Sequence, residues 1–150
     1  ATGGISRYRH SRSERIANTN RTGYTGVVKK VLIVDDSRTA RFFLKSCIPV
    51  EGFEIHEAEN GEVGVARFRE LNPDLTFMDL TMPVMDGFDA IAAIRREFPE
   101  ARIVVLTADV QRQTQERIAA AGVTTFLQKP PQKDAVRKAL AEFFPEDIAL

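Results

Sequence analysis

The segment VLIVDDS, from Val31 to Ser37, places four consecutive aliphatic residues directly before two adjacent aspartates. A continuous run of β-branched residues and leucine is typical of a strand buried on both faces, because a half-exposed strand alternates apolar and polar residues. Ser37 can cap a following helix, which Pro49 helps to end. The segment therefore predicts a buried strand that carries two carboxylates at its carboxyl end.

The same alternation of strand and helix continues along the chain. Further apolar runs of strand length stand at Phe53–Ala58, Leu75–Met78, Ile103–Leu106 and Thr125–Leu127. Apolar residues at helical spacing predict helices from Asn60 to Leu71, from Phe88 to Ile94, from Val110 to Ala121 and from Ala135 to Phe143. This order predicts an α/β fold, in which five helices cover both faces of a five-stranded parallel sheet.

Composition divides the chain into a tail and one domain. Residues 1–26 carry five arginines and one glutamate with few large apolar groups, so we interpret them as a basic, disordered tail. Residues 27–150 carry 16 basic and 20 acidic residues, a charge balance that argues against nucleic acid as a partner. No apolar run is long enough to span a membrane and no signal peptide is apparent. A single cysteine, Cys47, stands at helical spacing and is predicted to be a buried thiol in a cytoplasmic protein.

Polar side chains follow the predicted strands at the points where the strands end. Asp35 and Asp36 follow the first strand, Asp79 the third, Thr107 the fourth and Lys129 the fifth. In open parallel sheets these carboxyl ends share one edge, where ligands bind. Three crowded carboxylates resist joint ionisation, and a divalent cation relieves their repulsion. Oxygen ligands in a partly open site suit Mg²⁺.

A carboxylate among such groups can act as a nucleophile toward phosphorus and form an aspartyl phosphate. Mg²⁺ and Lys129 would neutralise the phosphoryl oxygens, and the Thr107 hydroxyl could donate a hydrogen bond to them. No general base is required, because the attacking carboxylate is already an anion. The set of polar strand ends thus favours phosphoryl transfer to an aspartate.

Separated stretches of the chain resemble the receiver domain of two-component response regulators. The resemblance covers about residues 29–144 and is carried by VLIVDDS at Val31–Ser37, MDLTMPVMDG at Met78–Gly87, VVLTA at Val104–Ala108 and FLQKP at Phe126–Pro130. It implies a flavodoxin-like, doubly wound sheet with the strand order 2-1-3-4-5. It also implies a domain that spans residues 27–150 and works as a phosphorylation switch.

The resemblance assigns roles to the residues that would handle the metal and the phosphoryl group. It implies that Asp79 is the phosphoacceptor, that Asp36 and Asp79 bind Mg²⁺ directly, and that Asp35 binds it indirectly. The backbone carbonyl of Thr81 would be a further metal ligand. Lys129 would bind the phosphoryl group.

Other matching residues would carry the signal. Thr107 would be the switch hydroxyl, Ala108 would be small enough to let it move, and Phe126 would change its packing on activation. The Lys129–Pro130 peptide bond is implied to be cis. Pro131 departs from the family's usual large apolar residue, which leaves the start of the last helix open.

The resemblance implies partners as well. A histidine kinase or a histidine phosphotransfer protein would donate the phosphoryl group. The chain is expected to be a single-domain, chemotaxis-like regulator, a phosphoacceptor that assists its own phosphotransfer and dephosphorylation rather than an enzyme. It would signal to a protein target through the surface of the fourth helix, fifth strand and fifth helix.

Two alternatives compete with the phosphorylation switch. A pseudo-receiver would keep the fold as a binding module without being phosphorylated, which the intact set of strand-end residues argues against. A phosphatase or flavin protein on a similar fold is the other. Thr81 stands where such a phosphatase would carry an acid or base, and Asp35 and Asp36 would repel a flavin phosphate.

Elsewhere, Gly87 is interpreted as permitting a tight turn, and Arg95 as part of a solvated helix edge.

Overall fold

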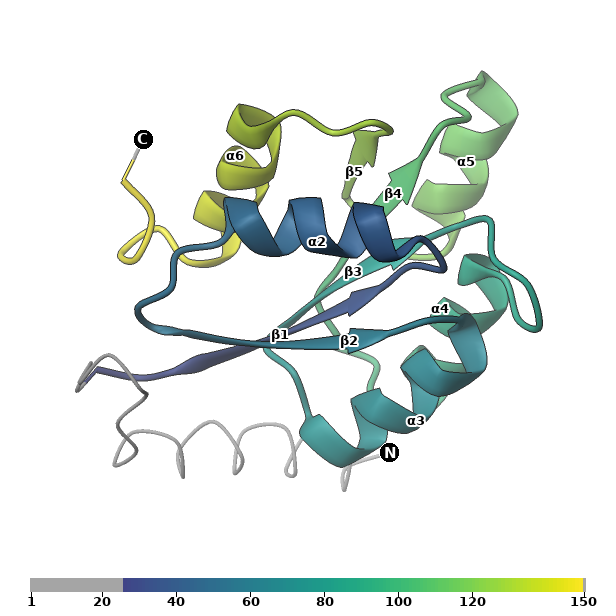
Figure 1. Cartoon of the computed structure of the whole chain (residues 1–150). Coiled ribbons are helices and arrows are strands. Elements are labelled where there is room, and N and C mark those ends of the chain that lie inside the picture. The colour runs from purple at the N-terminus through teal and green to yellow at the C-terminus, as the bar shows by residue number, and fades with distance from the viewer. Residues whose placement is uncertain (1–25, 150) are drawn as a thin grey trace.

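The computed structural model describes residues 26–149, so nearly all of the predicted tail lies outside the described residues. Strands and helices alternate through that range (Figure 1). The elements are β1 (Lys29–Val34), α2 (Arg38–Cys47), β2 (Phe53–Ala58), α3 (Gly61–Leu71), β3 (Leu75–Asp79), α4 (Gly87–Glu97), β4 (Ile103–Thr107), α5 (Arg112–Ala120), β5 (Thr125–Gln128) and α6 (Lys133–Phe143). The predicted α/β alternation is confirmed.

The strands form one parallel sheet in the order β2-β1-β3-β4-β5, as the resemblance implied. The register brings Val34 of β1 beside Met78 of β3, and Asp79 beside Leu106 of β4. The carboxyl ends of β1, β3 and β4 are therefore nearly level. The residues that follow or end these strands meet at one edge of the sheet.

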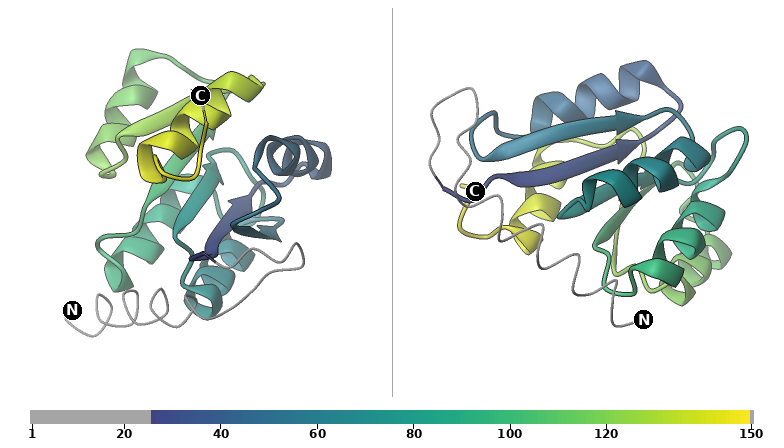
Figure 2. Two further views of the ribbon diagram at one scale, coloured as in Figure 1. Left: turned by 90° about the vertical axis from the view of Figure 1, so that its left-hand side faces the viewer. Right: turned by 90° about the horizontal axis from the view of Figure 1, so that it is seen from below.

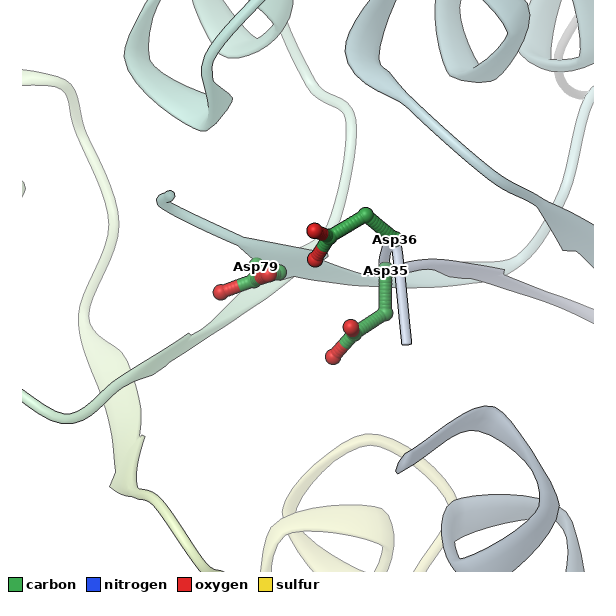
Figure 3. Close-up of side chains that lie close together, drawn as sticks. All are labelled: Asp35, Asp36 and Asp79. Atoms are coloured by element: carbon green, nitrogen blue, oxygen red, sulfur yellow. The ribbon is translucent and has the colours of Figure 1, made fainter. Parts of the chain in front are cut away.

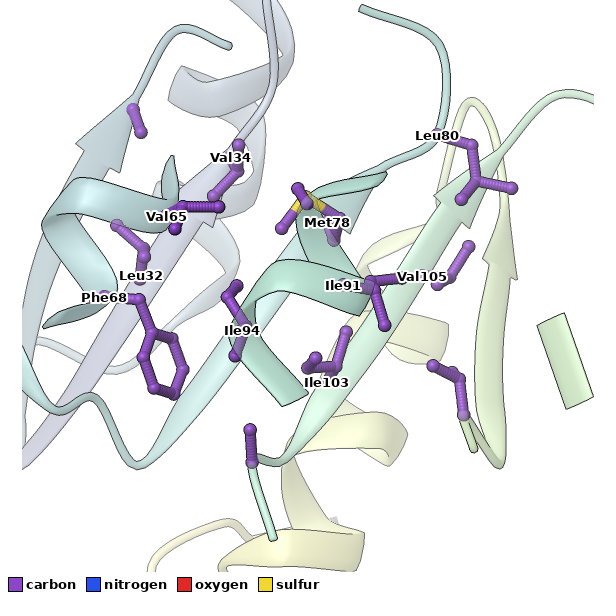
Figure 4. Packing of buried hydrophobic residues seen from close by; sticks show 14 of the residues in the cluster. Leu32, Val34, Val65, Phe68, Met78, Leu80, Ile91, Ile94, Ile103 and Val105 are labelled. Atoms are coloured by element: carbon purple, nitrogen blue, oxygen red, sulfur yellow. The ribbon is translucent and has the colours of Figure 1, made fainter. Parts of the chain in front are cut away.

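Helices cover both faces of the sheet (Figure 2), and a hydrophobic cluster lies on each face. Leu32 and Val34 of β1 pack with α3, α4 and α5, in the cluster drawn in Figure 4. Val31 and Ile33 pack with α2 and α6 on the other face. All four side chains are fully buried. This two-sided burial explains why β1 reads as an unbroken apolar run.

The predicted caps and the buried thiol are confirmed. The Ser37 hydroxyl accepts a hydrogen bond from the Ala40 N–H at 3.1 Å, and the Asn60 side chain accepts one from the Val63 N–H at 2.9 Å. Each bond satisfies a backbone donor at the start of α2 or α3 that has no partner within the helix. Cys47 lies on the buried side of α2 and is 2% exposed.

The start of α5 differs from the prediction. The helix begins at Arg112 rather than Val110. The Asp109 carboxylate accepts hydrogen bonds from the Gln111 N–H at 2.9 Å and the Thr114 hydroxyl at 2.6 Å. These bonds favour a turn before the helix, because aspartate side chains compete for backbone donors.

The last helix, whose start the sequence left open, begins at Lys133, two residues after Pro131. Its N-cap residue, Gln132, makes no side-chain capping bond. Within residues 26–149, no helix combines the length and the apolar character that crossing a membrane requires.

Candidate functional site

Three carboxylates converge at the carboxyl edge of the sheet (Figure 3). One oxygen from each of Asp35, Asp36 and Asp79 lies within 4.8 Å of the others. Asp35 and Asp79 are buried, whereas Asp36 is exposed. The structure thus brings together the three acids that the strand ends predicted, with one side of the cluster open to solvent.

Lys129, which follows β5, supplies the positive charge. Its Nζ donates a hydrogen bond to Asp35 Oδ2 at 2.8 Å and lies 3.4 Å from Asp79 Oδ1. Burial alone would lower the pKa of Lys129, but the hydrogen bond and charge of Asp35 and the charge of Asp79 raise it above its ordinary value. Lys129 is therefore fully charged at neutral pH, and its shorter contact is with Asp35.

The pKa of the Asp79 carboxyl lies close to neutral pH. Burial raises its pKa from 3.8 to about 6, and the neighbouring charge of Asp35 acts in the same direction. Lys129 and a 3.4 Å hydrogen bond from the Thr81 N–H oppose this rise. The cluster thus carries more negative than positive charge. Its ligand atoms are all oxygens, which fit a hard divalent cation such as Mg²⁺.

A close backbone contact fixes the end of β3. A Cβ atom at Gly87 would lie 2.3 Å from the Asp79 carbonyl oxygen. The Gly87 N–H donates to the Leu80 carbonyl at 2.9 Å. Gly87 is not among the positive-φ residues of the described chain, so the glycine there is required by close packing rather than by a left-handed backbone. Glycine is needed there because the start of α4 presses against the strand end that carries Asp79.

The Thr107 hydroxyl stands at the predicted strand end but is engaged locally. It donates to the Asp109 carbonyl at 3.1 Å and accepts from the Asp109 N–H at 3.0 Å. Phe126 on the neighbouring strand pairs with Val105 and packs, half-buried, against the cluster under α3, α4 and α5. Ala108 is exposed in the loop after β4. The Lys129–Pro130 peptide bond is cis, as the resemblance implied.

Two arginines depart from the sequence interpretation. Arg95 is half-buried rather than fully solvated, and its guanidinium donates to the carbonyls of Pro99 at 3.0 Å and Gly122 at 3.1 Å. Arg41 received no role from the sequence, yet it donates to the Asp35 carbonyl at 2.7 Å. No motif signals this contact, because its acceptor is a backbone atom.

Comparisons with known proteins agree with this geometry. The family model of the response regulator receiver domain matches residues 31–141. The chemotaxis protein CheY of Thermotoga maritima is 42% identical over 113 residues, which cover 75% of this chain and 94% of that protein. CheY of Bacillus subtilis is 39% identical over 112 residues, which cover 74% and 93%.

A solved structure is also similar. A chain of the CheX–CheY–BeF3–Mg complex from Borrelia burgdorferi superposes with a TM-score of 0.73 at 30% identity, covering 87% of this chain and 98% of that chain. The family model alone matches well over half of the sequence. The chain therefore belongs to the family of response regulator receiver domains, which are phosphoacceptor signalling modules.

Proposed function

We propose that this protein accepts a phosphoryl group on Asp79 in a Mg²⁺-dependent reaction and passes the resulting conformational change to a protein partner. The observation that carries the proposal is the position of Asp79: a buried carboxylate at the end of the central strand, beside two further acids and 3.4 Å from Lys129. A histidine kinase or a histidine phosphotransfer protein is the proposed donor.

The metal site is proposed to use the same acids. Asp36 and Asp79 would hold Mg²⁺ directly, together with the Thr81 backbone carbonyl, and Asp35 would act indirectly. When bound, Mg²⁺ would supply positive charge to the oxygens of the incoming phosphoryl group. The raised pKa of Asp79 supports this assignment, because a cation among these oxygens would favour the ionised form that attacks.

In the proposed transfer, an Asp79 oxygen forms a bond to phosphorus while the bond between phosphorus and the donor imidazole breaks. Lys129 lies near enough to Asp79 to reach the new phosphoryl oxygens, although it must share or give up its bond to Asp35. Thr107 is the other proposed contact. To reach the phosphoryl group, its hydroxyl must first break the two hydrogen bonds that it makes with the Asp109 backbone.

The proposed output surface consists of α5, β5 and α6. Thr107 ends β4, and Phe126 lies on the adjacent β5, so movement of the hydroxyl toward Asp79 would free space on the side where Phe126 packs. The Borrelia CheY relative was solved with BeF3, Mg²⁺ and the protein CheX. That likeness supports a protein partner and a Mg²⁺-assisted phosphoryl site for this chain.

Labelling with a small phosphodonor tests the phosphoacceptor. Incubation with acetyl phosphate and Mg²⁺ should add one phosphoryl group, detected by intact-mass spectrometry. Asp79→Ala should lose the label, and excess EDTA should abolish it in the wild type. Undiminished labelling of Asp79→Ala would show that another residue is the acceptor.

A thermal shift tests the metal ligand. Saturating Mg²⁺ at about 100 times its Kd should stabilise the wild type by about 2.7 kcal/mol and raise its melting temperature. Asp36→Ala should respond much less, whereas Glu51→Ala, which removes an exposed acid from the α2–β2 turn, should respond like the wild type. Equal shifts in wild type and Asp36→Ala would remove Asp36 as a ligand.

A further inference from the structure

The Arg41 side chain joins three parts of the sheet edge. From α2, its Nη1 donates to the Asp35 carbonyl at 2.7 Å, and its Nε donates to a Glu57 carboxylate oxygen on β2 at 3.0 Å. The Arg41 side chain is only 14% exposed, whereas the comparable Arg112–Glu116 pair on α5 has an Arg112 side chain that is 92% exposed. A largely desolvated guanidinium bound to a fixed backbone carbonyl holds its geometry better than a surface pair does, although its second acceptor, Glu57, is 39% exposed.

Each polar group of Asp35 has a partner. Its N–H donates to the Ala58 carbonyl at 3.1 Å, and its carboxylate accepts from the Ser37 N–H and from Lys129, both at 2.8 Å. Arg41 is the partner of its carbonyl. Arg41 therefore helps to hold the direction of the peptide unit that leads from Asp35 into Asp36, because that unit is planar.

Asp36 has no such support of its own. Its side chain is exposed, and among residues 26–149 no hydrogen bond or ion pair holds its carboxylate. The location of this carboxylate beside Asp79 therefore depends on the backbone before it, because no side-chain contact within the described residues fixes it. We propose that Arg41, oriented by Glu57, is a positioning residue for the divalent cation, acting through the Asp35–Asp36 peptide. This inference rests on the Mg²⁺ site of the proposed function.

The direction in which Mg²⁺ affinity changes when the Arg41 guanidinium is removed shows whether Arg41 acts by positioning a ligand or only by its charge. Removing the Arg41 guanidinium removes a positive charge from the neighbourhood of a cation site, which by Coulomb's law alone would tighten Mg²⁺ binding. Loss of a residue that orients a metal ligand weakens binding, typically by about 10–100-fold. Arg41→Met keeps a long apolar stem, so its effect on Mg²⁺ affinity reveals which influence dominates.

Titration calorimetry with MgCl₂ provides the test, because the chain has no tryptophan to report binding by fluorescence. Arg41→Met should raise the Mg²⁺ Kd by about tenfold or more. Two milder variants should each raise the Mg²⁺ Kd by less. Arg41→Lys replaces the planar guanidinium with a single ammonium group, and Glu57→Gln keeps a hydrogen-bond acceptor without the charge. Arg112→Met removes the same charge from a pair whose Nε also contacts a glutamate oxygen, at 3.1 Å, and should leave Kd unchanged.

A metal-free readout completes the test. Amide spectra in EDTA should show the Asp36 and Ser37 signals displaced in Arg41→Met and undisturbed in Arg112→Met. A Kd for Arg41→Met equal to or below the wild-type value would overturn the inference. If Arg41→Met does not fold, wild-type affinity in both Arg41→Lys and Glu57→Gln would overturn it instead. Absence of Mg²⁺ binding by the wild type would contradict the proposed function itself, which is a different result.

Discussion

The Asp79 carboxyl lies in surroundings that disfavour its charged form. Burial and the charge of Asp35 raise its pKa to about 6, despite the opposing charge of Lys129. At neutral pH the group is ionised and therefore able to attack phosphorus, but its ionisation costs folding free energy. A residue that is costly to the fold and lies at the centre of a charged cluster is better explained by function than by stability.

Asp79→Asn should stabilise the metal-free protein in a pH-dependent way. The folded-state pKa of about 6 exceeds the ordinary 3.8, so wild-type stability falls as pH rises through this window. Asparagine does not titrate, and the advantage of Asp79→Asn should grow from pH 4 to pH 6 and level off above, at about 1–3 kcal/mol. Urea unfolding in EDTA measures it, with Glu51→Gln as the exposed control. A pH-independent difference would contradict the assignment.

The sequence predicted that three acids and a lysine would lie together, because the fold collects the strand ends at one edge. It could not supply the contacts among them. Lys129 lies closer to Asp35 than to Asp79, and Arg41 reaches a backbone carbonyl, details that depend on side-chain conformation. Arg95 was misread for the same reason, since its acceptors are carbonyls at the ends of two helical segments.

At the scale of elements, the loop between β4 and α5 holds Thr107 in its present position. Thr107 exchanges two hydrogen bonds with the Asp109 backbone, and the Asp109 carboxylate is itself bound by Gln111 and Thr114. Apolar periodicity predicted both β4 and α5, but not that α5 begins two residues later than Val110, because these short polar contacts leave no periodic signal in the sequence. The same contacts must rearrange if Thr107 is to reach a phosphoryl group.

Thr107→Ala should separate phosphorylation from the conformational response. Lys129 and the acids remain in this variant, so Asp79 should still be labelled. When beryllofluoride and Mg²⁺ mimic the phosphoryl group, amide signals around Phe126 and in α5 should shift much less than in the wild type. Thr107→Ser keeps the hydroxyl and should retain the response. Wild-type shifts in Thr107→Ala would show that the proposed coupling is wrong.

At the scale of the whole molecule, the described residues contain two hydrophobic clusters. One runs from Leu32 to Val123 and the other from Val31 to Ile148. The 2.7 Å ion pair between Lys29 and Asp147 also joins the first strand to the segment after α6. These contacts join the two ends of residues 26–149, so we expect this range to fold as a unit.

Removal of residues 1–26 should therefore leave the domain intact. The shortened chain should melt within a few degrees of the full chain, since the clusters of the described residues are built from Val31 onward. Differential scanning calorimetry of both forms, with and without Mg²⁺, measures this. A large loss of melting temperature or of Mg²⁺-dependent labelling would show that the segment contributes to the domain.

Direct identification of the modified residue tests the central claim, phosphorylation of Asp79. After labelling with acetyl phosphate and Mg²⁺, borohydride reduces an aspartyl phosphate to homoserine, and tandem mass spectrometry then locates that residue in the sequence. We predict homoserine at position 79 and at no other aspartate, with the signal lost when EDTA is present during labelling. Homoserine at Asp35 or Asp36, or labelled protein with no homoserine at position 79, would contradict it.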